Sequence, residues 1–157
     1  MRRMLVWTRF IVVVVAAGLL AMLAACGSSS AAPSAPLDLT GTWSGQLGQP
    51  GSTSALRLTW VATQTGNVVS GIATLVKPAF NVQARGVMTG ILNGDRLILT
   101  FSVPSDSIPG FSTCEIAGLG NATATNDSIM GGIPLMFRSC AGTGLEPPES
   151  NDLRLTK

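Results

Sequence analysis

Few side chains in this 157-residue chain can carry out acid–base or nucleophilic chemistry. It has no histidine and no tyrosine, so carboxylates, lysines and hydroxyls are the groups left for proton transfer. No serine or cysteine lies in a nucleophile motif, and no glycine-rich turn leads into a helix that would hold phosphate. The acidic residues fall mostly in expected turns and loops: Asp38, Asp95, Asp106, Glu115, Asp127, Glu146, Glu149 and Asp152. We therefore expect no enzymatic activity, no catalytic residue and no cofactor.

Cys26 ends an N-terminal segment that is organised like a secretory signal. Three arginines within the first nine residues precede an apolar run over residues 10–25, and small residues come directly before the cysteine. The stretch Leu23-Ala24-Ala25-Cys26 resembles the lipobox of bacterial lipoproteins. This resemblance implies that residues 1–25 are removed and that Cys26 becomes a lipidated N-terminus on the extracytoplasmic face of the cell membrane. More than one acyl chain on that cysteine would make the anchoring stable.

Two alternatives to lipidation remain open. In the first, the segment over residues 10–25 is an uncleaved transmembrane anchor. This segment is shorter than the roughly 20 residues that cross a bilayer. In the second, an ordinary signal cleavage leaves Cys26 as a free thiol.

Residues 26–36 predict a flexible linker between the lipidated cysteine and a folded domain over residues 37–157. The linker sequence GSSSAAPSAP has nothing to bury, and its end-to-end distance is expected to be about 15–20 Å. Three of the ten Lys and Arg residues precede the expected cut, which leaves seven against eight Asp and Glu. The mature protein is thus near neutral and has no clustered basic surface, so nucleic acid is not an expected partner.

Cys114 and Cys140 remain after the lipidated cysteine, and in an oxidising compartment they most simply form a disulfide. Closing a loop of about 25 residues contributes roughly 3 kcal/mol in the chain-entropy model. A metal site is the alternative, but the chain has no histidine, and two cysteines do not complete a tetrahedral zinc shell.

From residue 37 onward, short alternating runs of Thr, Val, Ile and Leu are separated by Gly, Asn and Pro, which is typical of strands. The clearest run is Arg96–Val103, whose odd-numbered residues are all apolar and whose other face has Ile98 as its only apolar residue. Asn93-Gly94-Asp95 before it supplies the positive-φ residues of a tight hairpin.

About eight strands are expected, over residues 40–47, 55–64, 68–75, 82–92, 96–103, 113–124, 128–137 and 153–156. Sequential antiparallel strands without helices form a sandwich or an up-and-down barrel. A barrel removes the exposed edges of an open sheet, and the many glycines within the strands fit sites of sharp coiling. We therefore predict an all-β fold, an eight-stranded antiparallel up-and-down barrel.

The opening strand, LTGTWSGQLG over residues 39–48, resembles the first strand of the calycin superfamily, which includes lipocalins and avidins. The resemblance implies that Trp43 lies across the closed end of the barrel, and that an arginine of the last strand, here Arg154, packs over it. Alternation with Leu153 and Leu155 directs Arg154 outward instead. The chain departs from avidins at Gly45, where they carry a ligand-binding asparagine, so biotin is not expected.

Two classes of function remain open. In the first, the barrel encloses a small hydrophobic or amphipathic ligand. Small residues in strand 82–92, as on other strands, leave space for this ligand. Four large residues are expected to face the ligand: Trp43, Trp60, Met88 and Phe101. Met130 and Met136 join Met88 as candidates for an adaptable apolar pocket, with core filling as the alternative.

In the second class the interior is packed solid, and the protein acts through loops at its rim. The candidate loops cover residues 77–80, 104–111 and 141–150. Exposed Phe80, Ile108 or Phe111 would then contact a partner protein or lipid headgroups.

Overall fold

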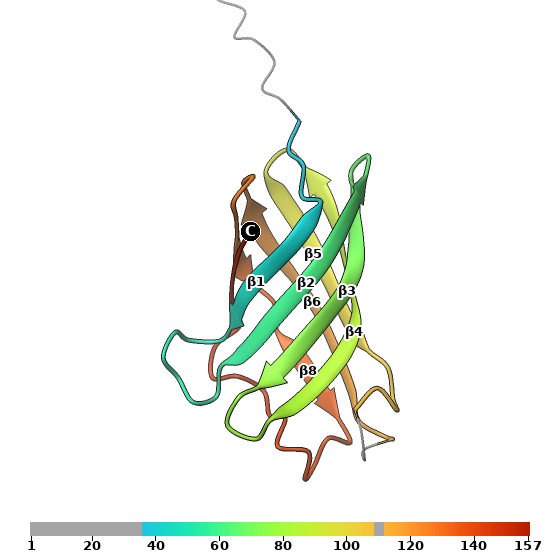
Figure 1. Cartoon of the computed structure of the whole chain (residues 1–157), viewed down its shortest axis with the longest axis vertical. Coiled ribbons are helices and arrows are strands. Elements are labelled where there is room, and N and C mark those ends of the chain that lie inside the picture. Colours follow the sequence, from blue (N-terminus) through green and yellow to red (C-terminus); the bar gives the residue numbers. More distant parts are fainter. Residues whose placement is uncertain (1–35, 109–111) are drawn as a thin grey trace, which may run out of the picture. The chain divides into compact units, whose positions relative to one another are not determined.

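The computed structural model describes residues 36–108 and 112–157. The expected signal segment, Cys26 and the linker up to residue 35 lie outside the described residues, and so does the loop tip 109–111 with Phe111. The described residues contain nine strands (Figure 1): β1 (Gly41–Leu47), β2 (Leu56–Thr65), β3 (Val68–Lys77), β4 (Val82–Asn93), β5 (Arg96–Val103), β6 (Glu115–Ala124), β7 (Ser128–Gly132), β8 (Leu135–Arg138) and β9 (Asp152–Thr156).

The strands form one closed antiparallel barrel, as the sequence predicted. β1 to β6 pair in chain order, β6 pairs with both β7 and β8, and β9 pairs with β7 on one side and β1 on the other. β7 and β8 share one position beside β6, so the wall has eight strand positions. The predicted strand 128–137 is split because Ile133-Pro134 interrupts it, and proline has no N–H to donate to a ladder.

Side chains alternate between the interior and the outer surface. In β5 the buried residues are the odd-numbered ones, and Ile98 lies on the outer face as expected. The inward side chains of all strands belong to one continuous core. Gly45 and Gly71 show the close packing expected of strand glycines, because a Cβ there would collide with carbonyl oxygens of Arg154 and Val61 on the neighbouring strands.

The two ends of the barrel differ in the length of their connections (Figure 1). The tight-turn end has three short turns, 66–67, 94–95 and 125–127, together with the start of β1 and the end of β9. The long-loop end has the connections 48–55, 78–81, 104–114 and 139–151. All three loops singled out in the sequence therefore lie at the long-loop end.

Candidate functional site

The four residues expected to face a ligand all point into the barrel and are buried. Trp43 on β1 lies directly opposite Trp60 on β2, and Met88 on β4 lies opposite Phe101 on β5. On β3, Ala73 is the cross-strand partner of Trp60, and Gly71, two positions earlier, is the partner of Met88. The two pairs thus occupy adjacent inward rows.

Trp43 lies near the tight-turn end, and its polar atom is satisfied. Its Nε1 donates a hydrogen bond of 2.7 Å to the carbonyl oxygen of Leu39. The cation over its ring is Lys157, whose Nζ lies 5.5 Å from the ring centroid. The structure does not have the arrangement that the calycin resemblance implied, with Arg154 over Trp43. Arg154 is exposed between the buried Leu153 and Leu155, as strand alternation predicted.

Gln64 ties the segment before β1 to the tight-turn end, a role that sequence reasoning missed. Its Oε1 accepts a hydrogen bond of 2.8 Å from the Leu39 N–H. Its Nε2 lies 3.0 Å from the carbonyl oxygens of both Leu37 and Gly66 and donates to them. Residues 37–40 are therefore held in a fixed path beside the end of β2.

Trp60 differs from Trp43 in that its indole N–H has no hydrogen-bond partner. The side chain is fully buried, and Nε1 is the one buried side-chain nitrogen or oxygen without a partner in residues 36–108 and 112–157. A buried donor left unsatisfied costs about 1–3 kcal/mol. The interior thus contains one donor that a bound acceptor atom would satisfy.

Leucines fill the space beside two inward glycines. A Cβ on Gly90 would lie 2.7 Å from Cδ1 of Leu97, and one on Gly118 would lie 2.6 Å from Cδ2 of Leu135. The expectation that small residues leave room is therefore wrong at these positions. Met130 and Met136 are exposed on the outer surface, so only Met88 of the three methionines lines the interior.

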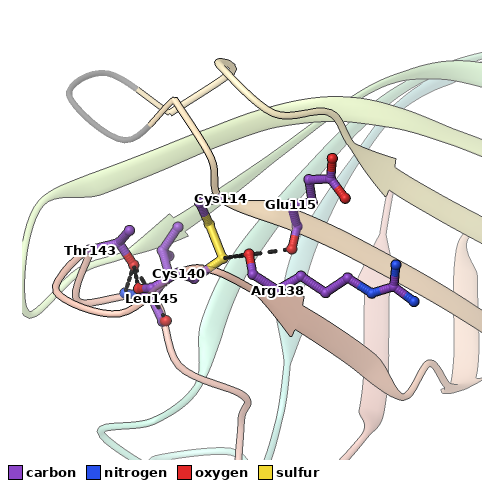
Figure 2. The surroundings of a disulfide bond; sticks show 6 residues. All are labelled: Cys114, Glu115, Arg138, Cys140, Thr143 and Leu145. Atoms are coloured by element: carbon purple, nitrogen blue, oxygen red, sulfur yellow. Dashed lines mark hydrogen bonds between the residues drawn. A yellow bond between two sulfur atoms is a disulfide. The ribbon is translucent and has the colours of Figure 1, made fainter.

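Cys114 and Cys140 form the predicted disulfide at the long-loop end, with their Cα atoms 4.5 Å apart (Figure 2). It joins the residue before β6 to the segment that follows β8, where Glu115 and Arg138 are cross-strand partners. The Cys140 sulfur also lies 3.1 Å from the Arg138 carbonyl oxygen. The bond fixes the point at which the long connection to β9 begins.

That connection folds inward over the mouth of the barrel. The Thr143 hydroxyl donates to the Cys140 carbonyl oxygen at 2.7 Å and accepts from the Leu145 N–H at 2.9 Å (Figure 2). Thr143 and Leu145 are both buried. A hollow of about 360 Å³ lies beside this segment, lined by Phe137 and by residues between 139 and 147.

Two of the proposed loop contacts have opposite surroundings. Phe80 is 62% exposed, as expected for a contact residue, and it lies against Gly144 of the neighbouring loop. Ile108 is 1% exposed and belongs to the core. The expectation of an exposed Ile108 is therefore wrong, because this side chain packs under its loop.

Lys77 is an unexpected inward residue at the same mouth. It follows Ala73 and Leu75 on the buried face of β3 and is only 4% exposed. All eight acidic side chains of the protein lie within the described residues, and all are exposed, so none shares its buried surroundings. Sequence reasoning placed Lys77 in a rim loop, although its alternation with Leu75 would have indicated the inward direction.

Within the described residues no group of His, Cys, Asp and Glu is arranged to hold a metal ion. The same residues include no helix long and apolar enough to cross a membrane. Comparisons with protein-family models, curated proteins and solved structures found no match for this chain. Its function is therefore argued from the geometry.

Proposed function

We propose that this protein is a lipoprotein, anchored by acylated Cys26 on the extracytoplasmic face of the cell membrane, whose barrel binds a small amphipathic ligand. The signal-like segment, the small residues before Cys26 and the linker support the anchoring. The Cys114–Cys140 disulfide supports an oxidising compartment. The proposal includes no catalytic step and no cofactor.

The unpartnered N–H of Trp60 is the observation that carries ligand binding. Buried polar groups in folded proteins almost always have a partner, so an exception calls for an explanation. An oxygen of a bound ligand would remove the desolvation cost without changing the fold. The surroundings of this N–H are otherwise apolar, which suits a ligand with a mostly hydrocarbon body.

Lys77 supports an acidic head group on the same ligand. It lies on the inward face of β3, four residues beyond Ala73, the cross-strand neighbour of Trp60. Four residues of strand span about 13 Å. A molecule with a carboxylate near Lys77 and an oxygen near Trp60 would pair with both groups, since a carboxylate attracts the ammonium and an oxygen accepts from the indole N–H.

Fluorescence titration of the domain over residues 36–157 tests this proposal. A Trp43→Phe variant leaves Trp60 as the reporter, and the probes are lauric acid and its ω-hydroxy analogue. We expect the hydroxy analogue to bind more tightly and Lys77→Met to weaken the binding of both probes. The preference should disappear in a Trp60→Phe variant that keeps Trp43 as the reporter. Absence of a fluorescence change or thermal shift with either probe, together with an empty protein in native mass spectrometry, would contradict ligand binding.

Metabolic labelling with a fatty acid tests the anchoring separately. We expect the label in the full-length protein, and none in a Cys26→Ser variant. A Cys114→Ser/Cys140→Ser variant is the matched control, because it changes the other two cysteines and should keep the label. Equal labelling of the Cys26→Ser variant would contradict the lipoprotein assignment.

A second candidate function is a solid barrel that contacts partner proteins through its long-loop end. The continuous core and the leucines beside Gly90 and Gly118 favour it. Exposed Phe80, held against the disulfide-clamped loop, would be its central contact. Binding of neither fatty-acid probe would favour this candidate over the first.

A further inference from the structure

The outer surface of the barrel has one strongly aliphatic region, which we call the aliphatic wall. It consists of six β-branched side chains that point outward from β2, β3, β4 and β5 and are 39–55% exposed: Val61, Val68, Ile72, Val87, Ile91 and Ile98. Exposed apolar side chains are ordinary when they are scattered, whereas a contiguous patch marks an interaction surface.

The strand register gathers these six side chains into two cross-strand rows. Ile72 lies opposite Val61 on one side and Val87 on the other, which gives one row across three strands. Ile91 likewise lies between Val68 and Ile98 in a second row. The row between them holds only hydroxyl side chains: Thr63, Ser70, Thr89 and Thr100.

The exposed charged residues on the strands of the aliphatic wall have one sign. β2 to β5 contain no Asp or Glu, and their exposed charged residues are Arg57, Arg85 and Arg96. The strands across the barrel carry both signs: Glu115, Arg138, Asp152 and Arg154. The strands of the wall thus combine apolar surface with cationic side chains, and the nearest acidic residue is Asp95 in the turn between β4 and β5.

A hollow of about 300 Å³ opens on the wall. It is lined by the aliphatic Val61 and Ile72 and by four polar residues, Thr59, Thr74, Gln83 and Arg85. Thr59 lies opposite Thr74, and Thr74 lies opposite Arg85, so the polar side chains form one row beside the aliphatic one. A guanidinium flanked by hydroxyls suits a phosphate oxygen, and the aliphatic floor suits the start of an acyl chain.

We propose that the aliphatic wall lies against an anionic lipid bilayer, with Arg85 and its neighbouring hydroxyls at a phospholipid headgroup. Apolar area combined with cationic side chains is what binds a protein surface to anionic lipid interfaces. A second copy of this chain is disfavoured as the occupant, because two arginine borders would face each other.

The expected linker joins the barrel at the end where part of the aliphatic wall lies, which suits a bilayer as the occupant. The described chain begins with Pro36 beside residues 37–40, which Gln64 holds at the tight-turn end, and Val68, Ile91 and Ile98 lie at that same end. Nine residues lie between Cys26 and Pro36 in the sequence. The distance from Cys26 to the barrel matters only if Cys26 is lipidated, as proposed above. The apolar and cationic side chains of the wall do not depend on lipidation.

Vesicle sedimentation of the unlipidated domain over residues 36–157 tests the wall by itself, since those residues form a closed barrel with its own core. The probes are vesicles of phosphatidylcholine alone and of phosphatidylcholine with phosphatidylglycerol. We expect binding to the anionic vesicles only, and weaker binding as salt rises. Ile72→Glu should weaken it about ten-fold or more, and Arg85→Gln about five-fold.

Met136→Glu is the matched control, because Met136 is 59% exposed and lies on β8, four strand positions around the wall from β3. Circular dichroism checks that all variants remain folded. Equal loss of binding in Met136→Glu and Ile72→Glu would overturn the proposal, and so would absence of binding to anionic vesicles. A domain that is dimeric without lipid and made monomeric by Ile72→Glu would assign the wall to a second copy instead. Failure of the lipidation test would leave this result unaffected.

Discussion

The tight-turn end and the long-loop end of the barrel are both covered, but the covering segments are held differently. At the tight-turn end, residues 37–40 are held by hydrogen bonds with Gln64 and with Trp43, over which Lys157 lies. At the long-loop end, a disulfide holds the start of the connection 139–151, and Thr143 folds it inward. The longer segment loses more conformational entropy when it is ordered, so a covalent constraint stabilises it where a few hydrogen bonds suffice for the shorter one.

Removing the disulfide should have the largest effect and should be confined to the long-loop end. A Cys114→Ser/Cys140→Ser variant is expected to lose about 3 kcal/mol of unfolding free energy, since the cross-link restricts a long loop in the unfolded chain. Urea denaturation measures the loss, and hydrogen exchange should show faster opening of residues 139–151 with residues 37–40 unchanged. An unchanged urea midpoint would show that the disulfide does not stabilise the long-loop end.

Gln64→Ala should weaken the opposite end by a smaller amount. The variant loses the side-chain hydrogen bonds to Leu37, Leu39 and Gly66, and we expect a cost of about 1–2 kcal/mol. Hydrogen exchange at the Leu39 amide should become faster. Gln83→Ala, at an exposed glutamine of β4, is the control and should leave that amide unchanged. Equal exchange in both variants would show that Gln64 does not fix the segment.

Lys157→Met should cost about 0.5–1 kcal/mol, because it keeps the aliphatic stem and removes the cation over Trp43. Arg154→Met is the matched control, because Arg154 is exposed between the core-facing Leu153 and Leu155, and it should change stability little. Thermal denaturation followed by tryptophan fluorescence compares the two. A larger effect at Arg154 would restore the arrangement that the calycin resemblance implied.

The smallest effect should come from acid. The Thr40 backbone N–H, which donates to Asp38 at 2.9 Å, holds the pKa of this carboxyl below its usual value of 3.8, and the Thr40 hydroxyl and the Lys157 charge act in the same direction. Since the folded-state pKa is the lower one, the stabilisation is present above pH 3.8 and is lost as pH falls through the folded value. An NMR titration of Asp38 should show this low pKa, and a Thr40→Pro variant, which lacks the N–H, should raise it.

The sequence predicted the barrel well because alternation and tight turns are local signals. The bounds of β5 follow from its alternating residues and from the turn at Gly94–Asp95. The break at Ile133-Pro134 was missed, although the proline was visible, because the flanking residues continue the strand pattern. The disulfide was predicted from the expected oxidising compartment and from the number of cysteines.

The remaining features depend on contacts between residues distant in sequence. Gln64 reaches Leu39 across 25 positions, and Lys157 lies over Trp43, which is distant from it in the sequence. The lone N–H of Trp60 is defined by what surrounds it in space, so no local pattern reveals it. The burial of Ile108 likewise depends on how its loop folds over the mouth.

The pairing of β1 with β9 also sets the order in which this protein can fold. Ser44 and Thr156 are partners in that ladder although they are 112 positions apart in the chain. The barrel therefore stays open until β9 has been synthesised and can pair with β1. A chain that lacks β9 cannot close the barrel. Barrel closure is therefore a late and comparatively slow folding step, because it depends on pairing between residues that are distant in sequence.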